Sequence, residues 1–368
     1  MKKNFLKDID WIILVCVVVL FTIGITVLYS CTQNSQLEEF KKQLTWLAIS
    51  IVAMIAFICI DYHTITRFSS IIYGIFILLL VGVLFTSPIN GATSWFDLGF
   101  FLFQPGEFAK VFVVIFLTYV ITKFQAKEKM EINKPWKLAV TLCVIILPIV
   151  LLAVQPDYGT AIAFLIATIF MLFVSGINKK YIFTAILLVI VLIPLLYFFV
   201  LPEHAKTRID VFLNPELDPR GAGYNIIQSK LAIGAGNLFG MGLLKGNQTQ
   251  LGFLYPKTTD FIFSVIGEEL GFIVSGLIVI VYVVLLTRAI SIAKNAKDDI
   301  GSYIAIGIVG ILFFHIVENI GMTIGLLPIT GVPLPFISYG GSSLITNFIC
   351  IGLLLNIRKR QKKSMFEK

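Results

Sequence analysis

Long apolar runs recur along almost the whole chain, and no other feature of the sequence constrains the fold as strongly. A helix needs roughly 20 apolar residues to cross the hydrocarbon core of a bilayer. Runs that approach this length lie at residues 11–30, 44–60, 69–87, 107–122, 138–154, 159–175, 181–200, 264–287, 302–324 and 342–357. They predict an all-α polytopic membrane protein with about ten transmembrane helices, in one integral membrane domain that spans residues 1–368.

The composition agrees with a lipid environment. Charged residues make up 14% of the 368 residues, whereas a soluble domain usually carries about 25%. Hydrophobic residues make up 58%, which is more apolar surface than a water-soluble core can bury. The first run is longer than the roughly 7–15-residue core of a signal peptide, so we expect it to remain as a helix.

The cations predict the orientation of the spans, because cytoplasmic loops carry an excess of Lys and Arg. With a cytoplasmic N-terminus, the inside segments hold 20 of the 29 cations and the short outside loops hold only Lys41 and Lys42. Both termini are therefore expected in the cytoplasm. A long extracellular loop, about residues 201–260, then connects the seventh and eighth helices.

The sequence disfavours two other kinds of site. The net charge is +8, but the cations lie between apolar runs and form no basic groove with interleaved aromatics, so nucleic-acid binding is not expected. The five cysteines are odd in number and lack CxxC spacing, so we expect neither a disulfide framework nor a zinc site.

Four segments rich in Gly, Pro and polar residues fall on the predicted outside face. The first, residues 91–110, contains Trp95, and also Glu107 and Lys110, which lie three apart on one helix face. A charge at membrane depth is costly unless it is paired or faces water. Glu107 and Lys110 therefore form a structural ion pair or line a polar cavity for a charged head group.

The second and third segments each contain an aspartate beside an apolar span. Asp157, in the loop 155–160, is either a helix N-cap or a functional group. Thr259 and Asp260 end the long loop, and a loop of that length is usually functional. Partial loss of water at the mouth of the next span makes the Asp260 carboxylate a usable general base, and a plain helix cap is the alternative.

The fourth segment, residues 331–343, breaks the helical pattern with two prolines and two adjacent glycines. Broken backbone at membrane depth is tolerated only where it is buried in protein or lines a water-filled cavity. Glu268 and Glu269 lie in the eighth predicted span. His315 and Glu318 share a face of the ninth, with Asn319 beside them. A His and Glu at this spacing can ligate a metal, but no second such pair appears, so we interpret them mainly as interhelical hydrogen-bonding groups.

Together these segments resemble the SEDS family (shape, elongation, division and sporulation), whose members include RodA and FtsW. The resemblance covers nearly the whole chain, and the short termini are more similar to RodA. It rests on QPGE at 104–107, QPDYGT at 155–160, TDFIFSVIGEELG at 259–271 and GLLPITGVPLPFISYGGSS at 325–343. The chain departs from the family at Ser94, where many members carry Arg, and at residues 255–258, where many carry Pro-Glu and often His.

The resemblance implies a glycosyltransferase that polymerises lipid II, the undecaprenyl-pyrophosphate-linked disaccharide peptide, at the outer face of the bacterial cytoplasmic membrane. It also implies a class B penicillin-binding protein, a transpeptidase, as partner. The essential aspartate of the family falls on Asp260, its buried acid and base on Glu107 and Lys110, and its loop aspartate on Asp157. From the same motifs, Trp95 and Thr259 are further candidates for substrate binding.

Inverting transfer from lipid II needs one base and stabilisation of the leaving pyrophosphate. We expect Asp260 to be the base. No cofactor follows from the sequence, although Asp157 is a candidate to shape the cavity or to hold a divalent cation near the pyrophosphate. The cations that are candidates to meet the phosphates are Lys110, Arg208, Arg220 and Lys230.

Two alternatives to an elongation polymerase stay open. One is a lipid II flippase, which the polar segments on one face disfavour because alternating access needs gates on both sides. The other is a non-catalytic scaffold of the cell-wall synthesis complex, for which changes at Asp260 would leave growth intact.

Overall fold

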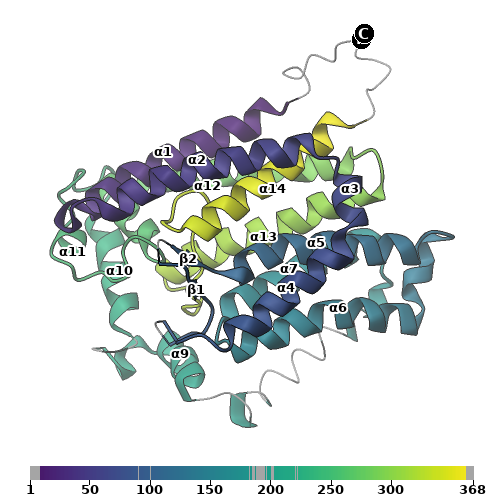
Figure 1. The fold of residues 1–368 in the computed structure, drawn as a ribbon. Coiled ribbons are helices and arrows are strands. Elements are labelled where there is room, and N and C mark those ends of the chain that lie inside the picture. The colour runs from purple at the N-terminus through teal and green to yellow at the C-terminus, as the bar shows by residue number, and fades with distance from the viewer. Residues whose placement is uncertain are drawn as a thin grey trace.

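The computed structural model describes residues 9–361 apart from 90, 100, 182, 185–186, 188–194, 196, 200–202, 220 and 222. The described part contains helices joined by turns and loops, and one short antiparallel pair of strands, β1 (Phe96–Asp97) and β2 (Leu102–Phe103) (Figure 1). The helices are α1 (Trp11–Cys31), η2 (Gln33–Ser35), α2 (Glu38–Cys59), α3 (Tyr62–Arg67), α4 (Ser69–Val83), α5 (Pro105–Phe124), η3 (Lys129–Asn133), α6 (Pro135–Val154), α7 (Tyr158–Ser175), α9 (Glu203–Leu213), η4 (Pro215–Leu217), α10 (Tyr224–Ala235), α11 (Asn247–Gln250), α12 (Ile262–Lys294), α13 (Asp299–Thr323) and α14 (Gly341–Lys359).

The prediction of an all-α polytopic membrane protein is confirmed. Within the described residues, seven helices are long and apolar enough to cross a membrane, and the shorter α4 is also apolar. Nine of the predicted spans coincide with a helix, while the span at 181–200 lies largely outside the described residues. The total of about ten crossings stays a prediction.

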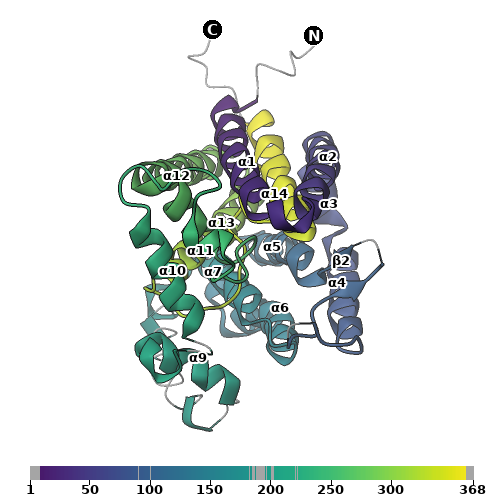
Figure 2. The ribbon, with the colours of Figure 1, turned by 90° about the vertical axis from the view of Figure 1, so that its left-hand side faces the viewer.

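The bundle is built around α13 and α14. Their apolar stretches are 78% and 83% buried, whereas that of the peripheral α2 is only 22% buried. Small residues allow α14 and α2 to approach closely: a Cβ on Gly352 of α14 would lie 2.7 Å from Met54 O of α2. Figure 2 shows α14 between α1 and α2, and α14 also contacts α13.

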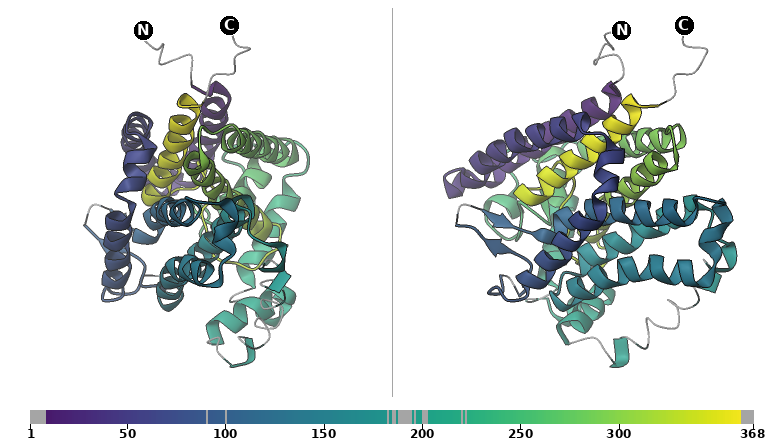
Figure 3. Two further views of the ribbon diagram at one scale, coloured as in Figure 1. Left: turned by 90° about the vertical axis from the view of Figure 1, so that its right-hand side faces the viewer. Right: turned by 45° about the vertical axis from the view of Figure 1, so that its right-hand side comes forward.

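The segments that sequence analysis assigned to the cytoplasm gather at one end of the bundle, which we call the terminal end. There Arg288 contacts Asp10, and Lys129 lies 3.1 Å from Asp299. Arg360 Nε donates to Asp61 Oδ2 at 3.2 Å. Figure 3 shows that α1 begins and α14 ends at this same end. The four polar segments lie at the opposite end, as the distribution of cations predicted.

The helix α12 differs from the eighth predicted span because it contains a break at Gly271, which has φ 79° and ψ −176°. The connection before α12 packs against this break, since Phe272 N donates to Asn237 O at 2.9 Å. A hydropathy window does not detect such a break. Glu268 and Glu269, assigned to a continuous span, instead lie in the short helical segment before Gly271.

Glu268 and Glu269 anchor the end of the predicted long loop. Glu268 accepts hydrogen bonds from Gln248 N at 2.7 Å and from Thr249 Oγ1 at 2.6 Å, at the start of α11. Glu269 accepts from Ser30 Oγ of α1 at 2.7 Å. The described part of this connection is not an open loop, because α10 and α11 pack against α12.

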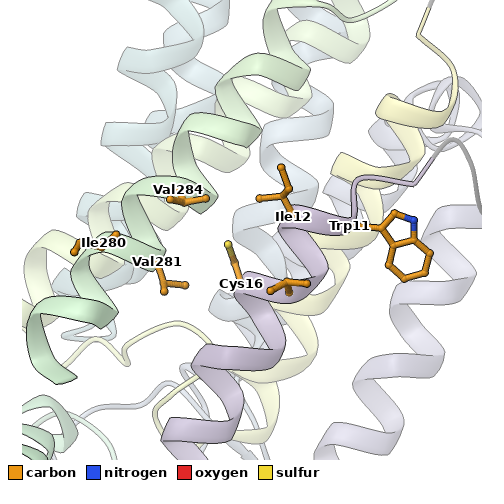
Figure 4. Close-up of a pocket in the computed structure, with 7 residues that line it drawn as sticks. Trp11, Ile12, Cys16, Ile280, Val281 and Val284 are labelled. Carbon is orange, nitrogen blue, oxygen red and sulfur yellow. The ribbon is translucent and has the colours of Figure 1, made fainter. Parts of the chain in front are cut away.

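A shallow groove between α1 and α12 has an apolar lining, shown in Figure 4. It offers no charged or hydroxyl group, so its surface suits lipid chains and not group-transfer chemistry. Its lining residues are Trp11, Ile12, Val15, Cys16, Ile280, Val281 and Val284.

Candidate functional site

Asp157 joins the first two polar segments. Its Oδ1 accepts from Thr160 N at 3.2 Å, so it caps α7 as the simpler interpretation predicted. Its Oδ2 also accepts from Gln104 Nε2 at 2.9 Å, which fixes the start of α5. Burial raises the pKa of the Asp157 carboxyl, and the nearby Glu107 carboxylate adds to the rise, despite the hydrogen bonds from Thr160 and Gln104.

Glu107 and Lys110 form the predicted ion pair on the first turns of α5. Lys110 Nζ lies 2.8 Å from Glu107 Oε1, and the two residues are only 2% and 3% exposed. Lys110 Nζ also lies 2.7 Å from His315 Nε2 on α13. The ion pair is therefore tied to a second helix, and its side chains lie inside the protein.

Asp260 lies just before α12, beside the fourth polar segment. Its carbonyl oxygen accepts from Asn319 Nδ2 at 3.0 Å, and the same amide donates to Val332 O at 2.8 Å. A Cβ added to Gly331 would lie 3.5 Å from Asp260 Oδ2, so the carboxylate faces the broken backbone. The N-cap position of α12 is Phe261, so Asp260 lies one residue before it.

Thr259 and the fourth segment hold each other in place. Ser338 Oγ donates to Thr259 O at 2.7 Å, and Tyr339 N donates to Thr258 O at 2.9 Å. Gln43 Nε2 of α2 donates to Ser338 O at 3.1 Å. These bonds satisfy the polar backbone that the prolines and glycines leave outside a helix. Val332 and residues 334–338 are buried, which is one of the two environments that the sequence allowed for this segment.

The same segment reaches α7 and α13. Thr330 Oγ1 donates to Glu318 Oε1 at 2.8 Å. A Cβ on Gly159 would lie 3.1 Å from Thr330 O and would overlap Val332, so α7 and the segment are in direct contact. Asp157 and Asp260 therefore lie at the same end of the bundle, on elements that both pack against residues 330–332.

Trp95 is half-buried in the first segment, where its carbonyl accepts from Thr86 Oγ1 at 3.1 Å. Its neighbour Ser94 takes the place of the arginine common in the family and donates to Gln155 O at 3.4 Å. This contact brings the first segment to the second. A role for Trp95 in substrate binding stays a prediction.

The candidate phosphate-binding cations are distributed unevenly. Lys110 is buried in the ion pair, whereas Lys230 is exposed on α10 beside Gly325. Arg220 and the side chain of Arg208 lie outside the described residues. Lys257 was not among the predicted phosphate-binding cations, although it lies three residues before Asp260. Lys257 Nζ donates to Thr249 O at 2.8 Å.

No metal site is evident in the part of the chain that the structure describes. It contains no group of three or more His, Cys, Asp or Glu side chains placed to hold a metal ion. Asp157 contributes a single carboxylate, whose oxygens already accept hydrogen bonds from Thr160 and Gln104.

Comparison with known proteins identifies the family. A family model described as "Cell cycle protein" and named for FtsW, RodA and SpoVE matches residues 10–363. The chain belongs to this family, the SEDS family. The resemblance that the motifs indicated is thereby confirmed.

SEDS relatives match along their whole length. The peptidoglycan glycosyltransferase MrdB of Escherichia coli K12 is 36% identical over 98% of this chain and 97% of its own. A chain of a solved peptidoglycan synthase complex, described as coordinating polymerization and crosslinking, aligns with a TM-score of 0.83 and 26% identity over 97% of this chain and 99% of that one. The rod shape determining protein RodA of Thermus thermophilus aligns with a TM-score of 0.72 and 25% identity, covering 97% and 98% of the two chains.

Two contacts of this SEDS chain were missed by sequence reasoning. His315 and Asn319 were identified as polar residues of one span, but nothing in their spacing shows that they touch Lys110 and Asp260. The available signal was their four-residue separation, which places both on one helix face.

Proposed function

We propose that this chain is a peptidoglycan glycosyltransferase that polymerises lipid II into glycan strands for cell elongation and shape. One observation carries the proposal: a relative named as a peptidoglycan glycosyltransferase is 36% identical over 98% of this chain, and includes the region in which the four polar segments meet. The packing of Asp157 and Asp260 against residues 330–332 gives that activity a place in the fold.

The reaction is an inverting transfer. The 4-hydroxyl of the acceptor sugar attacks the anomeric carbon of the donor, the bond to the lipid pyrophosphate breaks, and a β-1,4 bond forms. Asp260 accepts the hydroxyl proton, and the pyrophosphate leaves with the electron pair of the broken bond. Asp260 is half-buried beside the exposed Gly331, and this position is consistent with the role of a base.

The other site residues have supporting roles. Asp157 fixes the start of α5 and shapes the site, while Trp95 and Thr259 lie in segments that face the same end and contact substrate. The leaving pyrophosphate needs cations, and Lys257 and Lys230 are candidates because both side chains lie at this end and outside the buried ion pair.

The site faces outward from the bacterial cytoplasmic membrane, and both termini face the cytoplasm. The support is the concentration of Lys and Arg in segments that gather at the terminal end. Lipid II with its sugar outside would then reach Asp260 from the outer leaflet.

The partner is a class B penicillin-binding protein, a transpeptidase that crosslinks the strands. The support is a solved chain with a TM-score of 0.83 to this one, which belongs to a complex described as coordinating polymerization and crosslinking. A polymerase of glycan strands needs such an activity beside it.

The experiment is polymerisation of purified lipid II by the full chain and by Asp260→Asn, each with and without the transpeptidase. Loss of a general base lowers the rate by about 10²–10⁴-fold. The control is Asp299→Asn, at an exposed carboxylate of the terminal end, which is expected to keep its activity. An Asp260→Asn protein that is folded, binds its partner and polymerises at the wild-type rate would contradict the assignment.

Two further assays, one in proteoliposomes and one in cells, separate the two alternatives. Movement of labelled lipid II across proteoliposomes without polymer formation indicates a flippase. An unchanged growth phenotype for Asp260→Asn in cells indicates a scaffold.

A further inference from the structure

His315 connects the Glu107–Lys110 pair to the backbone at Pro333. Its Nε2 lies 2.7 Å from Lys110 Nζ, and its Nδ1 lies 3.2 Å from Pro333 O. The ring is 3% exposed, so these are its contacts inside the protein and not with solvent. One imidazole therefore joins the Glu107–Lys110 pair of α5 to the broken segment beside Asp260.

The two contacts fix the protonation of the ring. Pro333 O can only accept a hydrogen bond, so Nδ1 carries the hydrogen. The ammonium of Lys110 donates, so Nε2 accepts and carries none. His315 is consequently a neutral imidazole in the Nδ1–H form, and the cluster of Glu107, Lys110 and His315 has no net charge.

The segment that His315 holds is the one that positions Asp260. Three side chains of α13 hold residues 330–333, with His315 on Pro333 O, Glu318 on the Thr330 hydroxyl and Asn319 on Val332 O. Asn319 uses the same amide nitrogen to hold the carbonyl of Asp260. We therefore expect a shift at Pro333 to move Val332, whose carbonyl shares the Asn319 amide with Asp260, and Gly331, which lies beside Asp260 Oδ2.

We propose that His315 is a positioning residue for glycosyl transfer, which transmits the fixed geometry of the Glu107–Lys110 pair to Asp260 through residues 330–333. The inference rests on the proposed function. In this arrangement Lys110 does not meet the pyrophosphate, because its buried ammonium is already held by Glu107 and His315. The pair sets the position of the base and is not a ligand of the substrate.

Two substitutions at His315 separate positioning from general stability. Gln offers an oxygen acceptor for Lys110 and an N–H donor for Pro333 O, so His315→Gln retains both contacts. His315→Leu fills a similar volume and loses both. The matched control is His63→Leu, because His63 also bridges two partners, Asp61 and Asp298, but at the terminal end.

The kinetic result distinguishes positioning from substrate binding. We expect His315→Leu to lower kcat for lipid II polymerisation by about 100-fold with little change in KM, because a small misplacement of the base slows the chemical step. His315→Gln is expected to remain within about 5-fold of the wild type, and His63→Leu to match it. A rise in KM without loss of kcat in His315→Leu, or equal losses in Leu and Gln variants, overturns the proposal.

A second measurement does not depend on activity. Hydrogen exchange of the amides of Tyr339 and Phe261 reports the fourth segment and the Asp260 connection, because these amides donate to Thr258 O and Pro256 O. His315→Leu is expected to speed their exchange, whereas His315→Gln is not. Equal exchange in the wild type and both variants overturns the proposed link, whatever the activity. If the wild type makes no polymer with its partner while exchange responds as expected, the proposed function fails and the link between His315 and the segment stands.

Discussion

The Glu107–Lys110 pair at one end of the bundle and the Lys129–Asp299 pair at the other lie in very different surroundings. At the end with Asp260, the side chains of Lys110 and Glu107 are 2% and 4% exposed. At the terminal end, those of Lys129 and Asp299 are 64% and 50% exposed. An exposed pair contributes little to stability, whereas a buried pair costs desolvation and is strongly destabilising when one partner is lost.

The difference shows what each end does. At the terminal end the charged residues hold loops together, and water can replace an exposed contact such as that between Lys129 and Asp299. At the end with Asp260, buried groups hold broken backbone in a single arrangement, so each group depends on its partners. Hydrogen bonds from Lys137 and Lys134 lower the pKa of Glu131 to about 2 at the terminal end.

The largest expected difference between the ends follows from removal of one cation. Lys110→Met leaves the Glu107 carboxylate buried without its counterion, and we expect a loss of about 3–5 kcal/mol in the free energy of unfolding. Lys129→Met should lose less than about 1 kcal/mol. Thermal melting of the purified variants in detergent measures both. Equal losses would show that burial does not distinguish the two pairs.

Glycine substitutions test how tightly the fourth segment is packed. A Cβ at Gly159 would overlap Val332 Cγ1 and lie 3.1 Å from Thr330 O, so Gly159→Ala should cost about 1–3 kcal/mol through overpacking. The matched control is Gly276→Ala in α12, where a Cβ meets nothing within 4 Å and we expect a change below about 1 kcal/mol. If Gly159→Ala melts at the wild-type temperature, the segment can yield, and its role as a rigid support is contradicted.

The smallest effects are those of pH, and they have opposite signs at the two ends. The pKa of Asp157 is raised above the unfolded value of about 3.9, so stability falls as pH rises through the interval between the unfolded and folded values. Although burial opposes it, hydrogen bonds from His63 and attraction to Arg360 lower the pKa of Asp61. Its stabilising contribution is present above the unfolded pKa and is lost as pH falls through the folded value.

The measurement compares the melting temperature of Asn variants with that of the wild type between about pH 2 and about pH 7, because the Asp61 effect falls below the unfolded pKa of about 3.9 and the Asp157 effect above it. Asn caps a helix as well as Asp, so Asp157→Asn should gain relative to the wild type as pH rises. Asp61→Asn should lose over the same interval and approach the wild type in acid. If both variants change in the same direction with pH, these two carboxylates are not the source of the pH dependence of stability.

The parts of the fold that were predictable are those encoded locally. Apolar runs gave the helices because a span must satisfy its own backbone in lipid, and α7 was expected at 159–175 and found at Tyr158–Ser175. The motif at 155–160 offered a helix cap as one of two interpretations of Asp157, because Asp favours the N-cap position. The ion pair was also local, since Glu107 and Lys110 lie one turn apart.

The remaining features depend on contacts between distant segments. His315 is 205 residues from Lys110, and no periodicity in α5 or α13 reports that the two helices touch. The break at Gly271 was hidden because the residues on both sides are apolar, and only the approach of Asn237 and Leu238 explains it. The motif identified Asp260 as a candidate general base. The hydrogen bond from the Asn319 amide to the Asp260 carbonyl became visible only in the structure.

His315, Glu318 and Asn319 reach residues 330–333 only because their spacing places all three on one face of α13. An α-helix turns by about 100° per residue, so one inserted residue between 315 and 319 would rotate one end of this row away from residues 330–333. Insertions should therefore be tolerated in a connection such as 126–130, whose residues are all exposed. Among natural relatives of this chain, we expect the distance in sequence from His315 to Pro333 to be constant while that connection varies in length.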